Sequence, residues 1–449
     1  MVALYLIALY VLYAFFTDLG VTNPQLSWML VGERSAEGYL QYLEIIDDTG
    51  PFSVGVFALL DWLFGRNFLA YEILGRVFIL WIAIYWNLIL NKYRVFNETN
   101  YLPALVMIAL FHYSFDMLSI SPSLMGGGFL ILALGQLISQ TVLQKKTSES
   151  TLLIGIYGGV AVCFQASFIV FLPYLIFTGI IVSGFSFRQV LLALAGYFLP
   201  FLLIGTFYFW NDGLTEFLEI WPQVLFMDKI SYQSISSWLI AGSLPLGLAT
   251  LGYIYSSLLR ASTINQQKQR QLLILWLLIS CLSFFFIKDQ AAFQLLIFIP
   301  VLTYLISSFF LNQRKKRLIS FSFFLLIIAF PIFCGWYWTI YIPDTRNYFT
   351  TEKNIQETGI DLMVMEKDLS PYLKNKLGGP FLNYSLSKEL LSRELSLEQK
   401  ARFFQLLETQ KPSLVIDPKG TFENLLNEFP TLKGEYVKTE ADRFELMKR

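Results

Sequence analysis

Five carboxylates lie close together near the start of the chain, and they are the residues best suited to acid–base chemistry. Residues 21–51 contain one basic side chain, Arg34, against five acids: Glu33, Glu37, Glu44, Asp47 and Asp48. A carboxylate beside apolar residues has a raised pKa, which suits it as a general base toward a hydroxyl group. Glu33 follows the apolar run Trp28–Val31 and, if residues 27–42 are helical, shares a face with Glu37. The alternative is that each acid only solvates an external loop.

The composition of the chain is that of a membrane protein. Of its 449 residues, 55% are hydrophobic and only 15% are charged, whereas soluble proteins carry about 25% charged residues. Apolar runs long enough to span a bilayer recur along the chain. The formal net charge is zero, so no nucleic-acid partner is expected. The three cysteines lie in apolar runs and His112 is the single histidine, so these residue types predict no metal site.

Hydropathy predicts eleven membrane spans in the order 2–16, 68–90, 101–118, 124–143, two short spans within 151–182 that break near 165–167, then 190–210, 236–259, 272–287, 291–311 and 318–340. Short loops rich in Lys and Arg stay cytoplasmic, which places these residues inside: Lys92, Arg94, Lys145, Lys146, Arg188, Arg260, Lys268, Arg270 and Arg314–Arg317. Residues 52–64 are too short to cross and are predicted to be an interfacial helix. The protein is therefore predicted to lie in the inner (cytoplasmic) membrane, with a cytoplasmic N-terminus and with residues 20–67 outside.

The composition changes abruptly after residue 342, where charged and turn-forming residues replace the apolar runs. Short apolar runs at 361–365, 413–416 and 443–447 suit strands, while 396–410 and 422–429 have helical periods. Ser396, followed by Gln399, is the expected cap of the first helix. We therefore predict a polytopic all-α membrane domain over 1–342, and a small soluble α/β domain over 343–449 that lies outside the membrane by parity.

The acidic loop has a characteristic order of residues: Gly38, Tyr42, Glu44, Asp47-Asp48, Pro51, and then an apolar helix ending in Leu63-Phe64-Gly65. This order resembles the first external loop of GT-C-fold glycosyltransferases, such as the protein O-mannosyltransferases and the aminoarabinose transferases of lipid A. The resemblance in sequence covers about residues 28–76. It implies a polytopic helical fold followed by a soluble external domain, and it implies sugar donors carried on polyprenyl phosphate.

The resemblance also implies roles for single residues. The catalytic acid of the superfamily stands about a dozen residues before the glycine, where this chain has Gln25, which cannot act as a base. Glu33 is the nearest carboxylate, Glu44 matches the second acidic position, and Asp47 is the third catalytic candidate. Tyr42 and Asp48 are expected substrate contacts. Lys288 is a third, because these enzymes commonly bind the donor phosphate with a basic residue of a late external loop; the alternative is that Lys288 and Asp289 only form a solvated turn. A divalent cation stays open as a cofactor.

Three functions stay open at this point. The first is a membrane glycosyltransferase that moves a sugar from a polyprenyl-phosphate carrier to an extracytoplasmic glycan or protein. The second is a non-catalytic component of cell-envelope assembly or protein secretion, which the glutamine at the acid position favours. A transporter is the least favoured, since internal repeats and broken or charged midspan helices are not evident. His112 and Asp116, four residues apart in a span, are further candidates for function.

Residues 97–103 and 118–122 also resemble an uncharacterised family of polytopic membrane proteins from Bacteroidota. This likeness carries no information on activity.

Overall fold

The computed structural model describes residues 1–16, 20–142, 148–258, 262–341, 348–351, 358–392 and 396–447. The chain packs as two compact units. Unit 1 consists of Met1–Leu19, Leu69–Ile204 and Lys229–Thr345, and unit 2 consists of Gly20–Phe68, Gly205–Asp228 and Arg346–Arg449.

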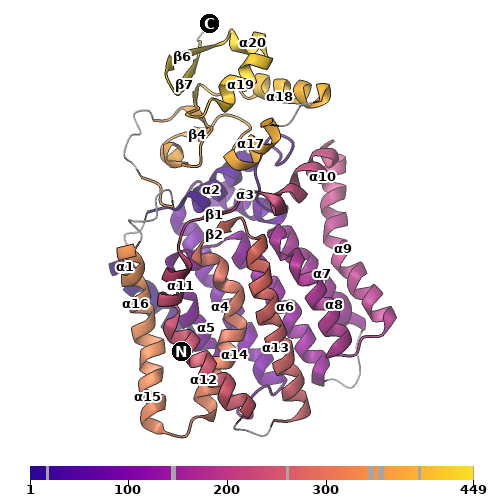
Figure 1. Ribbon diagram of the computed structural model, residues 1–449, viewed down its shortest axis with the longest axis vertical. Coiled ribbons are helices and arrows are strands. Elements are labelled where there is room, and N and C mark those ends of the chain that lie inside the picture. The colour runs from indigo at the N-terminus through magenta and orange to yellow at the C-terminus, as the bar shows by residue number, and fades with distance from the viewer. Residues whose placement is uncertain are drawn as a thin grey trace. The chain divides into compact units, whose positions relative to one another are not determined.

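Unit 1 is helical, and its helices run side by side (Figure 1). Its elements are α1 (Val2–Phe16), α4 (Phe68–Lys92), α5 (Leu102–Phe111), α6 (Pro122–Val142), α7 (Ser148–Phe164), α8 (Phe171–Ile181), α9 (Phe187–Trp210), α11 (Ile235–Ala241), α12 (Ser243–Leu258), α13 (Ile264–Ser283), α14 (Ile299–Asn312), α15 (Lys316–Phe324) and α16 (Phe330–Tyr341), with a parallel pair of two-residue strands, β1 (Ile230–Ser231) and β2 (Asp289–Gln290). The predicted polytopic helical fold is confirmed.

Within the described residues, six helical segments are long and apolar enough to cross a membrane: Phe68–Lys92, Pro122–Val142, Phe187–Trp210, Ile264–Phe286, Ala292–Asn312 and Lys316–Ile340. The bent pair α11 and α12 makes a seventh segment, and shorter apolar helices lie at the other predicted positions. The expected break in the 151–182 run is present, because α7 ends at Phe164 and a 3₁₀ turn, Ala166–Val170, precedes α8.

Two predicted spans differ in shape from a single straight helix. The 236–259 span bends by 67° between α11 and α12, since the ring of Pro245 would clash with the carbonyl of Ala241 in a continuous helix. The 101–118 span is α only to Phe111 and ends in a 3₁₀ turn, Phe115–Leu118.

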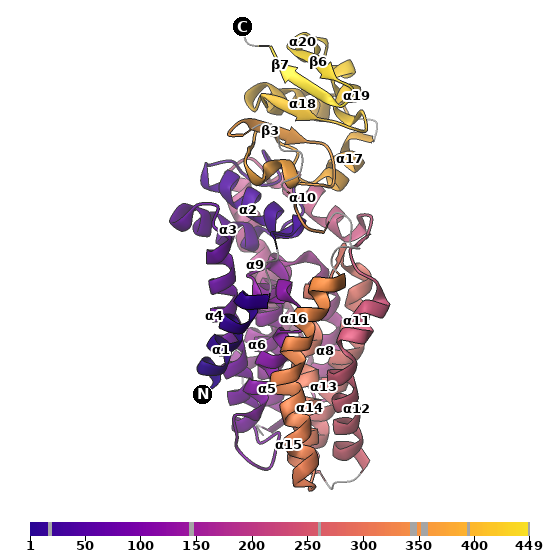
Figure 2. The same cartoon turned by 90° about the vertical axis from the view of Figure 1, so that its left-hand side faces the viewer.

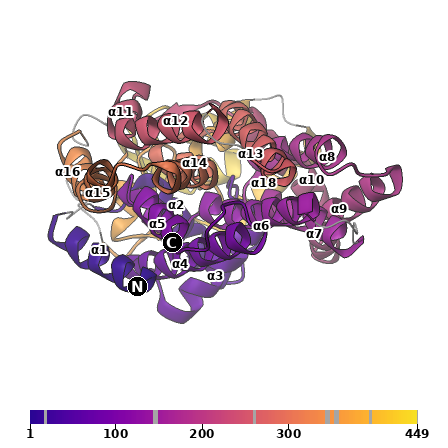
Figure 3. The same cartoon turned by 90° about the horizontal axis from the view of Figure 1, so that it is seen from below.

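The interior of unit 1 is built around α5, α6 and α14, which lie inside when the helices are viewed end-on (Figure 3). The apolar windows of α6 and α14 are 89% and 78% buried, against 28% for the window of α9. Glycines allow the closest approaches: a Cβ on Gly252 of α12 would collide with the Leu305 carbonyl of α14, and one on Gly155 of α7 with the Ala193 carbonyl of α9. Small residues at such crossings are the usual means of helix packing in membranes.

Unit 2 contains α2 (Asn23–Ala36), α3 (Pro51–Phe64), α10 (Leu214–Gln223) and a five-stranded sheet with its helices. The strand order is β4 (Lys376–Leu377), β3 (Asp361–Val364), β5 (Leu414–Ile416), β7 (Arg443–Leu446) and β6 (Tyr436–Glu440), with β3 parallel to β4 and β5, and β7 antiparallel to both neighbours. The helices are α17 (Tyr384–Ser392), α18 (Leu397–Thr409), α19 (Thr421–Glu428) and α20 (Pro430–Lys433) (Figure 2).

The three predicted strands and both predicted helices of this α/β region are present. Ser396 and Gln399 form the expected capping box of α18. The sequence missed β4 and β6 for physical reasons: β4 has two residues, and four of the five residues of β6 are exposed, so neither shows a buried apolar run. Unit 2 also includes segments outside 343–449, because the first loop bonds to this region through the Ile46 amide and the Pro380 carbonyl (2.7 Å).

Candidate functional site

Gln25, at the position where the resemblance expects an acid, has a structural role at the start of α2. Thr22 caps the helix with its hydroxyl, which accepts a hydrogen bond from the Gln25 amide (3.3 Å). In return the Gln25 side-chain oxygen accepts from the Thr22 amide (3.0 Å). Gln25 is 3% exposed. This residue is therefore part of a capping box, in which a glutamine satisfies a helix-end donor.

Helix α2 lies directly against α3 because it carries a glycine where the two helices touch. A Cβ on Gly32 would come within 2.7 Å of the Phe57 carbonyl oxygen of α3, and Trp28 stacks on the ring of Phe57 with centroids 6.0 Å apart. The next residue after Gly32 is Glu33. The close contact therefore sets the position of the Glu33 carboxylate relative to the end of α3.

The end of α2 and the end of α3 bring opposite charges together in what we name the charged cluster: Glu33, Glu37, Asp61, Arg66 and Lys376. Arg66 forms an ion pair with Oε2 of Glu33 through both Nη2 and Nε (Nε to Oε2, 3.0 Å). Its Nη1 donates to the carbonyls of Tyr372 (2.5 Å) and Asn375 (3.0 Å). Glu37 pairs with Arg34 (2.9 Å) and with the exposed Lys376 (3.3 Å). The sequence missed Arg66 and Lys376 as partners of these acids.

Asp61 is the third carboxylate of the charged cluster, and the sequence pattern noted it only as a polar residue in an apolar helix. Its pKa is raised by partial burial and by the charges of Glu33 and Glu37, against the opposing effect of Arg66 and Lys376. Burial and neighbouring like charges both disfavour the ionised form of a carboxyl group. Asp61 is therefore harder to ionise than a free aspartate.

The acids beyond Glu37 organise the loop that contains them. The predicted helix over 27–42 ends at Ala36, because Gly38 has a φ of +102° that continues no helix. Glu44 Oε2 accepts from the Leu40 amide (2.8 Å), and the fully buried Asp47 accepts from the Thr49 amide (2.8 Å). The buried Tyr42 donates its hydroxyl to the Thr49 carbonyl (2.8 Å).

The same loop is bonded to other parts of unit 2. Asp48 accepts from the Asn383 side chain (2.5 Å). Arg402 of α18 donates to the Tyr42 carbonyl (2.6 Å) and pairs with Glu216 of α10 (3.6 Å). Of the predicted site residues in unit 2, the structure thus places Glu33 in the charged cluster and Tyr42, Glu44, Asp47 and Asp48 in this loop.

The predicted residues of unit 1 have local partners. Lys288 pairs with the adjacent Asp289 (3.4 Å), which belongs to β2. The ring of the fully buried His112 lies 2.8 Å from the Ile108 carbonyl through Nδ1 and edge-on to Tyr13. The buried Asp116 accepts from the Phe293 amide (3.3 Å). The contacts of His112 and Asp116 are those of residues that hold the helices of unit 1 together.

Arg76 is a buried charge within a predicted span that the sequence pattern did not single out. It is 9% exposed, pairs with Glu72 one turn earlier on α4 (3.3 Å), and lies over the Tyr10 ring (4.5 Å). The signal that could have found it is the acid–base pair four residues apart inside an apolar run. Ionisable residues within spans are functional candidates by default.

Unit 1 also contains an apolar groove of about 240 Å³ beside the bend between α11 and α12. Its lining includes Leu110, Tyr113, Met117, Trp238, Leu239, Gly242, Leu246, Phe298 and Leu302. The polar groups of the Tyr113 and Trp238 rings already have hydrogen-bond partners. The Tyr113 hydroxyl donates to the Trp238 carbonyl (2.8 Å), and the Trp238 ring nitrogen donates to the Gln233 side chain (2.8 Å). The remaining surface suits a hydrocarbon chain.

The part of the chain that the structure describes offers no set of ligands for the divalent cation that the sequence left open. There, no three His, Cys, Asp or Glu side chains are placed to hold a metal ion.

The fold as a whole has known counterparts, although no family model matches the sequence and no curated protein matches it significantly. ArnT from Cupriavidus metallidurans bound to undecaprenyl phosphate is 13% identical with a TM-score of 0.55, covering 99% of this chain and 97% of that one. The apo state of the same enzyme gives a TM-score of 0.53, with the same identity and coverage. ArnT is an aminoarabinose transferase of the GT-C fold. This chain has the GT-C fold. The fold predicted from the acidic loop is thereby confirmed, while the roles of single residues stay predictions.

Proposed function

We propose that this GT-C chain is an integral membrane glycosyltransferase that moves a sugar from a polyprenyl-phosphate carrier to an extracytoplasmic glycan or protein acceptor. The observation that carries the proposal is the end-to-end likeness to a structure of ArnT bound to undecaprenyl phosphate. The apolar groove of unit 1 supports it as a place for part of the isoprenoid chain. Lys288 is the proposed contact of the donor phosphate.

In the proposed reaction, the acceptor hydroxyl oxygen bonds to the anomeric carbon of the sugar as the bond from that carbon to the phosphate oxygen breaks. The bonding pair leaves with the phosphate, and the hydroxyl proton passes to a carboxylate. Glu33 is the proposed base, because its position is set by the Gly32 contact and by Arg66. Glu44 and Asp47 remain the reserve candidates, although their carboxylates bond backbone amides.

The test is Glu33→Gln, with Glu37→Gln as a matched control one turn away in the same charged cluster. Loss of a general base lowers a rate by about 10²–10⁴, so we expect E33Q to abolish transfer in an envelope-glycan assay while the protein remains folded in the membrane. E37Q should transfer nearly as the parent does. If E33Q, E44Q and D47N all transfer normally, the enzyme proposal is wrong.

The second candidate is a non-catalytic component of cell-envelope assembly or protein secretion. The observation that favours it is Gln25, whose side chain completes a helix cap where the resemblance expects a base. A normal envelope glycan in E33Q cells, together with loss of envelope assembly on deletion of the chain, would support this candidate.

The proposed orientation puts the N-terminus and Lys315 in the cytoplasm, with Glu44 and Lys419 outside, as the positive charges of the short loops require. A cysteine placed at Lys419 should react with a membrane-impermeant reagent without permeabilisation of the inner membrane. A cysteine at Lys315 should react only after permeabilisation. The reverse pattern would overturn the orientation.

A further inference from the structure

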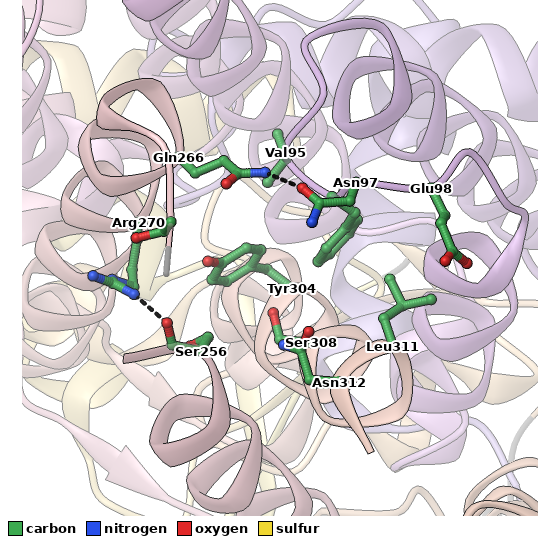
Figure 4. A pocket seen from close by; sticks show the side chains of 12 residues that line it. Val95, Asn97, Glu98, Ser256, Gln266, Arg270, Tyr304, Ser308, Leu311 and Asn312 are labelled. Atoms are coloured by element: carbon green, nitrogen blue, oxygen red, sulfur yellow. Dashed lines mark hydrogen bonds between the residues drawn. The ribbon is translucent and has the colours of Figure 1, made fainter. Parts of the chain in front are cut away.

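A polar pocket of about 60 Å³ lies in unit 1 where α12 and α14 end and α13 begins, closed by the loop between α4 and α5. Figure 4 shows the side chains that line it, among them Asn97, Ser256, Gln266, Arg270, Tyr304 and Asn312. The charged cluster and the apolar groove contribute no residue to this pocket.

The lining supplies many hydrogen-bond donors around one permanent cation. Arg270 is half-buried and donates one bond, from Nη1 to the Ser256 carbonyl (2.5 Å), which holds the guanidinium at the wall. The Tyr304 hydroxyl points toward Arg270 (Figure 4). Gln266 donates to the Asn97 side-chain oxygen (2.9 Å), so the amide nitrogen is the other polar group of this lining side chain. A guanidinium among hydroxyl and amide donors is a typical site for phosphate.

A run of basic residues follows the pocket's last lining residue in the sequence. The run Arg314–Arg317 begins two residues after Asn312. Gln313 fixes this run, because its side-chain oxygen accepts from the Arg314 amide (2.8 Å) and its nitrogen donates to the Tyr255 hydroxyl on α12 (3.0 Å). The proposed orientation places this run at the cytoplasmic face, where anionic lipids concentrate and basic pockets between helices bind their headgroups.

We propose that this pocket binds the phosphate of an anionic phospholipid headgroup in the cytoplasmic leaflet. The pocket is small, so it takes only the phosphate, and the acyl chains lie along outward-facing apolar residues nearby, such as Ile254 and Ile264, which are 38% and 73% exposed. Glu98 is exposed at the rim of the pocket. Its carboxylate repels the phosphate and so lowers the affinity of the pocket for the lipid.

The experiment measures thermal unfolding of the full-length purified protein in neutral detergent, titrated with short-chain phosphatidylglycerol, short-chain phosphatidylcholine or inorganic phosphate. We expect phosphatidylglycerol to raise the unfolding temperature in a saturable manner, and the other two ligands to have little effect at equal concentration. Arg270→Gln should raise the half-saturating concentration about tenfold or more. Lys268→Gln, on the same helix but outside the pocket, should change it less than about twofold.

Two further variants keep the test decisive if R270Q folds poorly. Asn97→Asp places a second acid at the exposed rim and should weaken phosphatidylglycerol binding, whereas Glu98→Gln should tighten it. Equal stabilisation by phosphatidylcholine, or R270Q and N97D behaving like the parent, would overturn the proposal. Saturable, Arg270-dependent protection by inorganic phosphate at the same concentration would overturn the lipid as the ligand. None of these readouts depends on sugar transfer, so they stand or fall separately from the proposed function.

Discussion

Two pairs of carboxylates, one in each half of the acidic loop, have different kinds of partner. Glu33 and Glu37 bind cationic side chains from distant segments, Arg66 and Lys376. Glu44 and Asp47 bind backbone amides two to four residues away. An acid held by its own loop's amides stabilises the loop, whereas one held by a distant cation can exchange that partner for a substrate group. The comparison favours the first half of the loop as the place for chemistry.

Among the variants that test this comparison, removing the cation of the first half should have the largest effect. Arg66→Gln breaks the ion pair with Glu33 and the bonds to the Tyr372 and Asn375 carbonyls, so we expect transfer to fall by an order of magnitude or more. We also expect the free energy of unfolding to fall by about 1.5–3 kcal/mol, the contribution of hydrogen bonds to a charged group. Transfer assays and thermal unfolding of the purified protein measure the two effects.

Lys376→Gln is the matched control, because Lys376 is exposed and its ion pair should contribute at most about 1 kcal/mol. If R66Q and K376Q are equally mild, the distinction between the two halves of the loop is lost.

The second effect concerns stability in the other half. Asp47→Ala leaves the buried Thr49 amide without its acceptor, which should cost about 1–3 kcal/mol. Asp47→Asn keeps an acceptor oxygen and should cost less. Thermal unfolding checks both variants, and transfer per folded molecule should be retained in D47N. Loss of transfer in D47N with an unchanged unfolding temperature would instead make Asp47 a catalytic residue.

The smallest expected effect is at Asp61, whose pKa is raised above the ordinary value of 3.8 in the folded protein. Ionisation is therefore less favourable in the folded than in the unfolded state, and stability falls as the pH rises from the unfolded pKa through the folded one. Asp61→Asn removes this penalty, so it should stabilise the protein at neutral pH by less than about 1 kcal/mol, given the solvent exposure of the site.

The pH dependence gives the control for this prediction. Below about pH 4 the Asp61 carboxyl becomes protonated in both the folded and the unfolded protein. The gain in stability from D61N should therefore vanish there. An advantage of equal size at both pH values would mean that the variant acts through packing rather than through charge.

Local patterns in the sequence were sufficient for the fold class. Hydropathy located the apolar helices and the break near Gln165, and apolar runs located three strands of the sheet, because these features depend on each segment's own burial. The bend at Gly242 and the short strand β4 were not predictable in the same way. The bend follows from one proline close to a helix start, and β4 is defined only by its pairing with β3.

The sequence by itself determined that the chain is a polytopic membrane protein with an acidic first loop and a small α/β region, since hydrophobicity and charge act residue by residue. It also made Glu33 the first candidate for the base, which stays a prediction. Only the tertiary structure decided what each acid binds: Arg66 lies 33 residues from Glu33 and contacts carbonyls more than 300 residues away. The pocket around Arg270 likewise combines Asn97, Ser256 and Asn312 from separate segments. Such groupings arise from packing between distant segments, so a local pattern of residue types does not predict them.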